Sequence, residues 1–255
     1  MMNNVSISPK AIIGNNCNIR EFSVIEDDVI IGDNVEIGPS AFIGKGSRIG
    51  DGVRIQHCAS IGVWPNSVSY KGEYTTTEIG EGTFIKNHAA VCRGTTYAYK
   101  TVIGKNCYIM DSAHVGHDNI IGNEVTITAY VALGGHVQID DYANIGGVSG
   151  VHQFSKIGKY VMVEMLSKIQ KDVPPFVLAA RVPTRYVGLN TRGLTRRGFT
   201  SDRIEHIKDA YRILYDAGLN VSDAIQRIQE DLEMTDDIKE ILNFIKNSSR
   251  GIIRK

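Results

Sequence analysis

Aliphatic residues recur at every sixth position over most of the chain. The series runs without a miss from Ile7 to Ile61, returns at Ile79 and continues from Ile103 to Ile169, and glycine often follows the aliphatic residue. A period of six matches neither an α-helix, with a period of about 3.6, nor a single strand, with a period of about 2. It is typical of a coil of three short strands, each of which sends one aliphatic side chain inward.

The repeat predicts a mainly β protein built as a parallel β-helix of triangular section. We expect stacked aliphatic side chains inside the prism, and glycine or asparagine at corners that need a positive φ. An ordinary β-sandwich is the alternative, but its strands would not keep one phase over so many repeats. The repeat is interrupted near residues 63–77 and 92–101. These segments are expected to be loops, and loops on a repetitive scaffold often carry function.

The pattern changes after Ile169. Residues 172–176, with two consecutive prolines, predict an extended exit from the coil. Apolar residues at helical spacing then predict three amphipathic helices, which would cover the otherwise open end of the solenoid. We therefore divide the chain into a β-helix over residues 1–190 and an α-helical domain over residues 191–255.

The limits of these helices can be predicted from capping residues. The first helix contains Ile204 and Leu214 and is expected to stop at Gly218, because glycine is common just after a helix. Ser222 is the expected N-cap of the second helix, and Thr235 that of the third.

Composition excludes several functions. Lys+Arg and Asp+Glu are both 28, so the chain has no basic excess that would make nucleic acid its main partner. Its four cysteines form no Cys-x-x-Cys pair, which argues against a zinc knuckle or a disulfide framework and favours a cytoplasmic protein. No window approaches the roughly 18 apolar residues of a spanning helix, so membrane insertion is not expected.

Histidines gather in the second run of repeats. Four of the seven lie there, namely His114, His117, His136 and His152. Their spacing should place them along one edge of the prism, with coils about 4.8 Å apart. An imidazole can act as a general base near neutral pH, and a carboxylate such as Asp118 can hold its tautomer. Asp118 directly follows His117, so contact between them requires a turn. A backbone N–H in a glycine turn, such as Gly134-Gly135 before His136, could stabilise an oxyanion.

Two interpretations from other functional classes compete with acid–base catalysis. Three imidazoles could bind a metal, as in the carbonic anhydrases built on the same kind of helix, which would make the protein a metal-dependent hydratase. The His-x-x-x-x-His spacing expected there is absent, because Gly122 lies five residues after His117. A non-catalytic hexapeptide-repeat binding protein is the other alternative. His57, His88 and His206 are interpreted as surface or packing residues.

Five motifs, in order, resemble the acyl-carrier-protein:UDP-N-acetylglucosamine O-acyltransferases of lipid A biosynthesis, which belong to the hexapeptide-repeat acyltransferases. The likeness covers nearly the whole chain. The motifs are AHVGHD at residues 113–118, LGGHV at 133–137, VHQF at 151–154, DVPP at 172–175 and GLTRRGF at 193–199.

This resemblance implies a left-handed β-helix, a cytosolic homotrimer and active sites in clefts between neighbouring prisms. It implies acyl transfer from the phosphopantetheine of acyl carrier protein to the 3-hydroxyl of UDP-N-acetylglucosamine, without a metal or redox cofactor. His117 would be the base, Asp118 would support it, and the Gly135 N–H would hold the oxyanion. The other implied contacts are His114, His136, His152 and Gln153 for the sugar and phosphopantetheine, and Asn190, Arg196 and Arg197 for the nucleotide or its phosphates.

The first loop departs from the family. Ser67 and Ser69 stand where members usually carry an Asp and a Lys that contact the sugar and its phosphate. We expect Lys71 to reach the same phosphate, because it lies two residues beyond Ser69 on the same side of an extended segment. Cys92 stands where members commonly have a histidine in the second loop, and Arg192 stands where they frequently have a glutamate. A paralogue that acylates another nucleotide sugar, including a 3-amino analogue that would give an amide, therefore stays open.

Acyl-chain length is a further point of departure. Members with long acyl donors often carry Gly-Gly after Met-Val, whereas this chain has Glu164 and Met165 at those places. Side chains there should block a straight acyl groove. We therefore expect Met165 to select a shorter donor.

Overall fold

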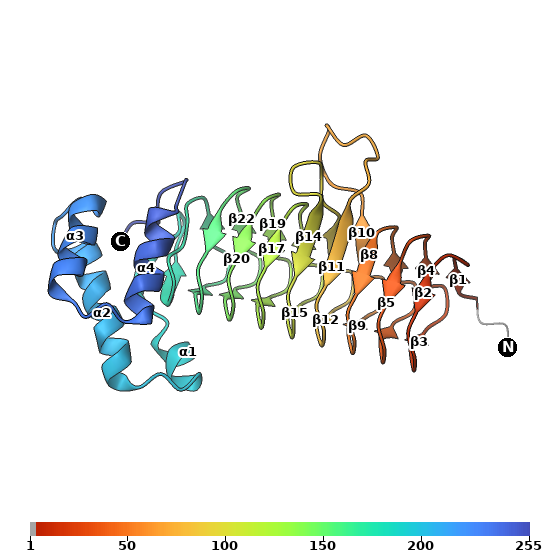
Figure 1. Ribbon diagram of the computed structural model, residues 1–255, viewed down its shortest axis with the longest axis horizontal. Helices are drawn as coiled ribbons and strands as arrows, with labels where there is room; N and C mark the ends of the chain where they lie inside the picture. Colours follow the sequence, from red (N-terminus) through yellow and green to blue (C-terminus); the bar gives the residue numbers. More distant parts are fainter. Residues whose placement is uncertain (1–3) are drawn as a thin grey trace.

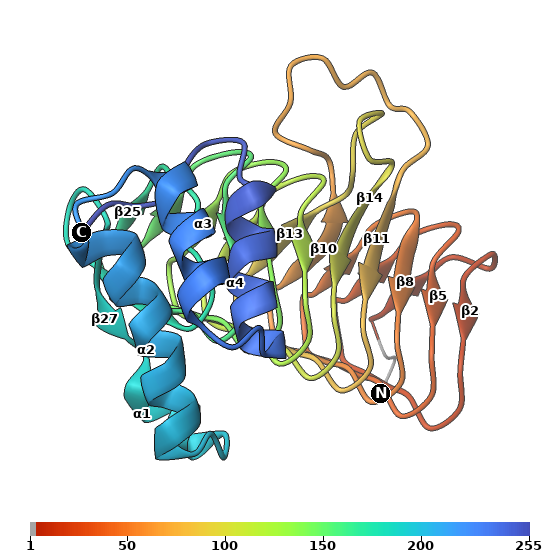
Figure 2. The same cartoon turned by 60° about the vertical axis from the view of Figure 1, so that its left-hand side comes forward.

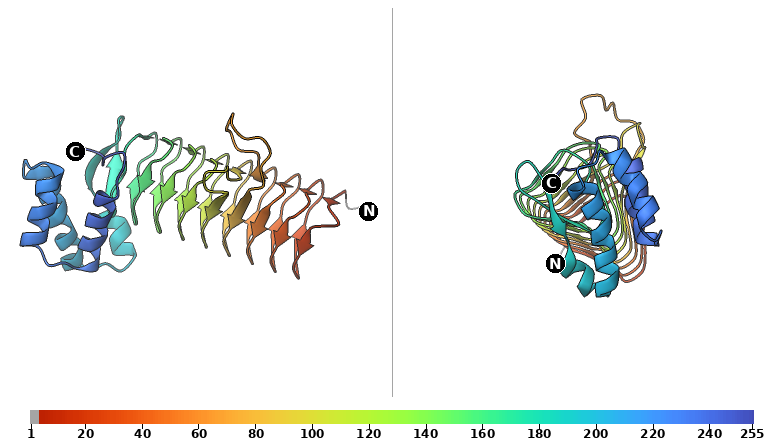
Figure 3. Two further views of the ribbon diagram at one scale, coloured as in Figure 1. Left: turned by 45° about the horizontal axis from the view of Figure 1, so that its top comes forward. Right: turned by 90° about the vertical axis from the view of Figure 1, so that its left-hand side faces the viewer.

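The computed structural model describes residues 4–255 as a parallel β-helix followed by helices (Figure 1). Its strands wind in turn through three sheets, called faces A, B and C below, and the view along the axis shows the coils superposed (Figure 3). This confirms the fold predicted from the six-residue period. Strands three apart in the sequence pair in parallel register, so that Val115 lies between Val91 and Leu133.

The strands of each face follow one another along the prism. Face A contains β1 (Ser6–Ile7), β4 (Val24–Ile25), β7 (Phe42–Ile43), β10 (Ser60–Val63), β13 (Ala90–Cys92), β16 (His114–Val115), β19 (Ala132–Leu133), β22 (Gly150–Val151) and β25 (Lys168–Ile169). Face B contains β2 (Ile12–Ile13), β5 (Ile30–Ile31), β8 (Ser47–Ile49), β11 (Thr76–Ile79), β14 (Lys100–Ile103), β17 (Ile120–Ile121), β20 (Gln138–Ile139) and β23 (Lys156–Ile157). Face C contains β3 (Asn18–Ile19), β6 (Glu36–Ile37), β9 (Arg54–Ile55), β12 (Phe84–Ile85), β15 (Tyr108–Ile109), β18 (Thr126–Ile127), β21 (Asn144–Ile145), β24 (Met162–Val163), β26 (Val177–Ala180) and β27 (Arg185–Leu189).

The repeated aliphatic residues form the core of the prism. They are buried from Ile25 to Ile169, whereas Ile7 in the first coil is 42% exposed. A second buried position follows each aliphatic residue by four and holds a small residue, such as Val29 or Ala59. The interior is therefore filled by two side chains per repeat, and the sequence pattern had indicated only the larger one.

The predicted glycines and asparagines occur at some corners, such as Gly46 (φ 80°), Gly52 (φ 62°) and Asn34 (φ 58°), but most glycines of the repeat lie elsewhere. The left-handed position is the third residue after the aliphatic one, and it accepts Asn106 (φ 53°), Tyr130 (φ 59°) and even Val148 (φ 57°). Glycine instead occupies the first position after the aliphatic residue, where the next coil passes closely. A Cβ on Gly104 would lie 2.4 Å from the carbonyl oxygen of Gly122. Close approach between coils, rather than a positive φ, explains the repeated glycines.

Both interruptions of the repeat leave the prism at the corner between faces A and B. The first connects β10 to β11, and the second connects β13 to β14. They project together from the prism in Figures 1 and 2. The coil after the second loop brings residues 116–119 to the same corner.

Residues 172–176 do not leave the coil, so the predicted exit is wrong. Val173 bridges to Ile157, and the chain continues into β26, which pairs with β24. The antiparallel strand β27 then ends the sheet. Near the C-terminus, Ile252 bridges to Asp172 and covers part of the last coil.

Four helices follow the strands: α1 (Thr191–Arg196), α2 (Ser201–Asp216), α3 (Val221–Asp231) and α4 (Asp236–Lys246). Thr235 caps α4 as predicted, and Gly218 follows the end of α2 with φ 69°. Ser222 is not the cap of α3, because Asn220 accepts the hydrogen bond from the Asp223 N–H. The short α1 was missed because it buries a single residue, Leu194, and so has no apolar period. In residues 4–255 no helix has the length and apolar character needed to cross a membrane.

Candidate active site

His117 and Asp118 meet at the corner between faces A and B. The Nδ1 atom of His117 lies 2.7 Å from Oδ2 of Asp118. Consecutive side chains can touch here because Asp118 has φ 58°, so the backbone turns between the two strands. The carboxylate is completely buried, whereas the imidazole is 14% exposed. The predicted contact is therefore present, with the carboxylate behind the ring.

The second loop supplies most of the hydrogen bonds to Asp118. Oδ1 accepts from the backbone N–H of Thr95 at 2.8 Å and of Ala98 at 3.2 Å, and Oδ2 accepts from the Thr95 hydroxyl at 2.7 Å. Burial acts to raise the pKa of Asp118, but the hydrogen bonds from Thr95 and His117 outweigh it and lower the pKa. An ionised Asp118 accepts the Nδ1–H of His117, which leaves Nε2 free to take a proton.

Gly135 lies directly above His117 on the next coil. A Cβ at this position would lie 2.5 Å from Cε1 and 2.7 Å from Nε2 of the ring, so any side chain here would require the His117 ring to move. Within residues 4–255, no hydrogen bond to another protein group uses the Gly135 N–H. A backbone donor beside a basic nitrogen is what an oxyanion site requires.

His136 occupies the place above Asp118. Its Nδ1 lies 3.7 Å from Oδ2 of Asp118, and its ring stacks on Phe154 with centroids 4.2 Å apart. Tyr97 of the second loop meets the same imidazole edge-on, at 4.4 Å. Burial lowers the pKa of His136 and also that of His114, so both rings are neutral at pH 7. Neutral rings can bind polar groups of a substrate without placing a second cation beside His117.

A cleft of about 530 Å³ runs along face A from this corner. His114 and His117 line one end, His152 and Gln153 line the middle, and Lys168 lies at the far end, with Asn66 of the first loop at the rim. The cleft thus brings His114, His152 and Gln153 together with His117, whereas His136 lies behind it against Asp118, and Ser69 and Lys71 are not among its lining residues.

The predicted nucleotide contacts lie elsewhere on the molecule. Asn190, Arg196 and Arg197 line a separate pocket of about 690 Å³ on face C, beside α1. The Asn190 side chain accepts from the Gly193 N–H at 3.1 Å and donates to the Tyr160 carbonyl at 2.9 Å. A single chain therefore does not bring these residues to His117.

Arg197 and Arg196 differ in their surroundings within the face C pocket. The guanidinium of Arg197 pairs with Glu124 and lies 4.6 Å above the ring of Tyr142. Arg196 is exposed at the end of α1, and no ion pair joins it to another residue in the described part of the chain. Of the two, Arg196 has the guanidinium available for a phosphate.

The first loop contradicts one premise of the Lys71 prediction. Residues 67–70 form a turn, in which the Tyr70 N–H donates to the Ser67 carbonyl at 3.1 Å. Ser69 and Lys71 are therefore not on one side of an extended segment. Ser67 and Ser69 join their hydroxyls at 2.9 Å, and both Ser69 and Lys71 are exposed.

Two further departures from the family are separated from the cleft. Met165 lies at the corner between faces C and A, is 63% exposed and is not among the residues that line the histidine cleft. Cys92 is buried at the base of the second loop, and burial raises the pKa of its thiol.

The sequence interpretation missed the groups that hold the site together. They are Thr95, Tyr97, Ala98, Thr101 and Phe154. The hydroxyl of Thr101 accepts from the Asp118 N–H at 2.8 Å. Phe154 could have been found by adding one coil of the repeat to His136. The loop residues could not, because an irregular segment gives no register.

One group of side chains could hold a metal ion. Among the described residues, ligand atoms of His117, Asp118 and His136 lie within 4.8 Å of one another. However, both carboxylate oxygens of Asp118 already accept hydrogen bonds, from Thr95, Ala98 and His117. A metal ion would have to replace these bonds, so the donor set fits an acid–base pair better than a hydratase centre.

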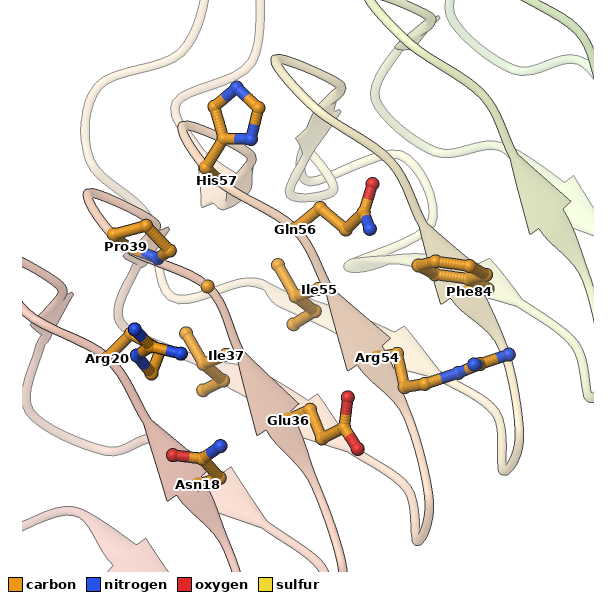
Figure 4. Close-up of a pocket in the computed structure, with 11 residues that line it drawn as sticks. Asn18, Arg20, Glu36, Ile37, Pro39, Arg54, Ile55, Gln56, His57 and Phe84 are labelled. Carbon is orange, nitrogen blue, oxygen red and sulfur yellow. The ribbon is translucent and has the colours of Figure 1, made fainter.

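A further groove lies on face C near the N-terminus (Figure 4). The guanidinium of Arg54 lies 4.2 Å above the ring of Phe84. His57 stands at the rim and meets His88 edge-on, with centroids 5.2 Å apart. No carboxylate backs this imidazole in the described chain, and the groove shares no residue with the histidine cleft.

The coiled hexapeptide scaffold and its histidine–carboxylate pair define a hexapeptide-repeat transferase. Residues 28–62 match the family described as bacterial transferase hexapeptide (six repeats), and residues 172–253 match that described as UDP-N-acetylglucosamine O-acyltransferase, domain 2. A curated relative from Sulfurihydrogenibium sp., an acyl-[acyl-carrier-protein]–UDP-N-acetylglucosamine O-acyltransferase, is 49% identical over 96% of this chain and 91% of its own length. A protein of the same name from Thermodesulfovibrio yellowstonii is 37% identical over 97% of this chain and 96% of its own. The chain belongs to the acyl-[acyl-carrier-protein]–UDP-N-acetylglucosamine O-acyltransferase family.

Solved structures agree with this membership. The UDP-N-acetylglucosamine acyltransferase of Bacteroides fragilis superposes with a TM-score of 0.98 at 41% identity and covers all of both chains. That of Francisella novicida gives a TM-score of 0.96 at 36% identity, over 99% of this chain and 93% of its own. The fold is a left-handed parallel β-helix, and the protein is an acyltransferase.

Proposed function

We propose that this protein transfers an acyl or 3-hydroxyacyl group from acyl carrier protein to the 3-hydroxyl of UDP-N-acetylglucosamine, the first step of lipid A biosynthesis. The observation that carries the proposal is the pairing of His117 with a buried, hydrogen-bonded Asp118 directly below the glycine backbone at Gly135. Relatives across the whole length of the chain bear the name of this activity.

The proton moves between three groups in this reaction. Nε2 of His117 takes the proton from the sugar hydroxyl as its oxygen bonds to the thioester carbon. The carbonyl oxygen becomes an oxyanion, to which the Gly135 N–H donates. When the carbon–sulfur bond breaks, the phosphopantetheine thiolate leaves and takes the proton from His117. Asp118 stabilises the imidazolium between these steps and remains ionised.

No metal or redox cofactor is part of this proposal. Addition of the sugar oxygen and departure of the thiolate each need one proton transfer and a stabilised oxyanion, which an imidazole and a backbone donor supply. His114, His136, His152 and Gln153 are proposed to orient the sugar and the pantetheine arm, since all but His136 line the cleft and His136 backs it.

We further propose that the active site is shared between copies of the chain in a homotrimer. The support is the separation of the two half-sites: the base lies at the edge of face A, whereas Asn190 and Arg196 lie on face C. A heterologous contact, face A of one copy against face C of the next, would bring the halves together, and a ring closes such contacts. Arg196 would then meet the nucleotide phosphates.

The identity of the acceptor sugar is the point to test, because Ser67 and Ser69 replace the Asp and Lys with which family members usually contact the sugar and its phosphate. The purified protein should be incubated with 3-hydroxyacyl carrier proteins of several lengths and with either UDP-N-acetylglucosamine or its 3-amino analogue, and the products identified by mass spectrometry. We expect an alkali-labile ester on UDP-N-acetylglucosamine. An amide formed only from the amino sugar would favour the paralogue, and release of free acid alone would contradict transfer to a nucleotide sugar.

A further inference from the structure

Asp118 is held by the second loop rather than by the prism. Of the four hydrogen bonds to its carboxylate, only the one from His117 comes from the same coil, and the other three come from Thr95 and Ala98. Thr95 makes two of them, one to each carboxylate oxygen. We propose that Thr95 is a positioning residue, whose hydroxyl fixes the carboxylate of Asp118 so that Nε2 of His117 faces the acceptor. This inference rests on the proposed function.

The direction of the Thr95 hydroxyl is determined by its neighbours. Its oxygen accepts from the Tyr97 backbone N–H at 3.2 Å and lies 2.7 Å from Oδ2 of Asp118. A hydroxyl has one proton, and an ionised carboxylate can only accept, so the Thr95 proton points to Asp118. Oδ2 therefore receives two donors, the threonine hydroxyl and the Nδ1–H of His117, and cannot rotate without losing both.

The loop that carries Thr95 is itself anchored. The buried guanidinium of Arg93 donates from Nε at 2.9 Å and from Nη2 at 2.7 Å to the Gly62 carbonyl, at the start of the first loop. The Arg93 N–H donates to the Val63 carbonyl at 2.9 Å. These bonds fix the base of the second loop against the preceding coil. The two loops at this corner are thus joined by hydrogen bonds, and these bonds also fix the position of the Thr95 hydroxyl.

Removing the hydroxyl should change the tautomer of His117, not the fold. Without the hydroxyl, Oδ1 keeps its two backbone donors but Oδ2 keeps only the Nδ1–H, so the position of Oδ2 is less fixed and its hold on the Nδ1–H tautomer weakens. A fraction of the imidazole then carries its proton on Nε2 and cannot act as a base. This would lower kcat without weakening the binding of either substrate, because the Thr95 hydroxyl makes its hydrogen bonds to protein groups and not to a substrate.

The test compares Thr95→Val with Thr95→Ser, which keeps the hydroxyl, and with Thr96→Val, an exposed neighbour that serves as the control. We expect Thr95→Val to lower kcat about tenfold or more with KM values within about threefold of native, while the other two stay near native. Nitrogen-15 shifts of His117 at pH 8 should show one Nδ1–H tautomer in the native protein and a mixture in Thr95→Val.

The tautomer measurement needs no activity, so it separates this inference from the proposed function. If the native protein fails to acylate UDP-N-acetylglucosamine but the tautomer responds as expected, only the function is wrong. The inference is overturned if Thr95→Val keeps native kcat, if Thr95→Ser is impaired as strongly, or if the tautomer does not change. Thr95→Ala is a second variant in case valine does not fit, and loss of the melting transition in both would assign Thr95 a purely structural role.

Discussion

The buried carboxylate of Asp118 is stabilised because every oxygen has a donor. An unpaired buried carboxylate would lose several kcal/mol of solvation, whereas hydrogen bonds to a charged group each contribute about 1.5–3 kcal/mol. The four bonds to Asp118 therefore hold it ionised at the pH where His117 must accept a proton. The pairing of these two residues is a property of the left-handed corner at Asp118, since neighbours on a straight strand would face apart.

Gly135→Ala should remove most of the activity with little loss of stability. A methyl group there would lie within 3 Å of three atoms of the His117 ring, so the imidazole must move away from Asp118. We expect kcat to fall at least 100-fold, in keeping with the usual contribution of a general base. The thermal melting midpoint should stay within a few degrees of native. Activity within tenfold of native would show that the ring has room to shift productively.

His117 and Asp118 could be predicted from the sequence because they are adjacent at an expected corner of the repeat, and Gly135 was predicted from the resemblance to the family. Thr95 could not, since its contact with Asp118 spans a loop whose path no period determines. The Lys71 prediction failed at its premise for the same reason: an extended segment was assumed where residues 67–70 turn.

At the level of the elements, most glycines of the coil and most of its left-handed residues stand at different positions of the repeat. Glycine at the first position after the aliphatic residue lets the next coil approach, and the third position turns the corner with almost any residue. The sequence assigned glycine and asparagine to the corners, which is confirmed at Gly46, Gly52 and Asn106, but it missed the task of the glycines at the first position. Steric approach between coils depends on the distance between backbones, which a one-dimensional pattern does not contain.

This division of tasks predicts opposite results for two positions in one corner. Gly104→Ala should lower the free energy of unfolding by about 1–3 kcal/mol, because the added Cβ would overlap the Gly122 carbonyl. Asn106→Gly, at a residue with φ 53°, should change it by less than about 1 kcal/mol. Urea denaturation measures both. A larger loss in Asn106→Gly would contradict our explanation of the glycines.

The junction between the prism and α4 contains a carboxyl group, that of Asp140, whose environment disfavours its ionised form. Burial, with a further contribution from Glu240, raises the pKa of Asp140 to about 6, although Lys159 acts to lower it. Lys159 also pairs with Glu240 of α4 at 3.2 Å. In the unfolded chain an aspartate titrates near pH 3.8. Between these two values the folded protein binds more protons, so stability falls as the pH rises through this window.

Asp140→Asn should therefore stabilise the protein at pH 7.5. The shift from 3.8 to about 6 corresponds to an upper value of about 3 kcal/mol, and partial exposure reduces it to roughly 1–3 kcal/mol. The gain should shrink at pH 5 and be nearly absent at pH 4. Urea denaturation at the three pH values measures this, with Glu36→Gln on face C as a control for removal of a charge. A gain that does not depend on pH would exclude the titration of Asp140 as its cause.

On the scale of the whole molecule, one chain contains two separate pockets on different faces. The His117 cleft follows face A, and the arginine pocket follows face C beside α1. The sequence predicted which residues belong to each pocket, since each motif is continuous in the chain. It could not show that they are separated in one chain, because the face of each residue follows only once the coil is built.

A mixture of two inactive variants should recover activity if neighbouring chains share the site. His117→Ala and Arg196→Ala, refolded together in equal amounts, would restore about one quarter of the native sites when chains associate at random in a head-to-tail ring. Each restored site takes its base from one chain and its arginine from the next. His117→Ala with Asp118→Ala, both on one face, is the control and should recover nothing. Equal failure of both mixtures would contradict a shared site.

The central claim is that His117 removes the acceptor proton, and His117→Ala tests it most directly. The variant should be assayed with acyl carrier protein thioester and UDP-N-acetylglucosamine, and the affinity for the nucleotide sugar measured by calorimetry. We predict that kcat falls by about 10²–10⁴ while the dissociation constant changes by less than about threefold. A variant that folds, binds the nucleotide sugar and still transfers the acyl group within tenfold of the native rate would contradict the claim.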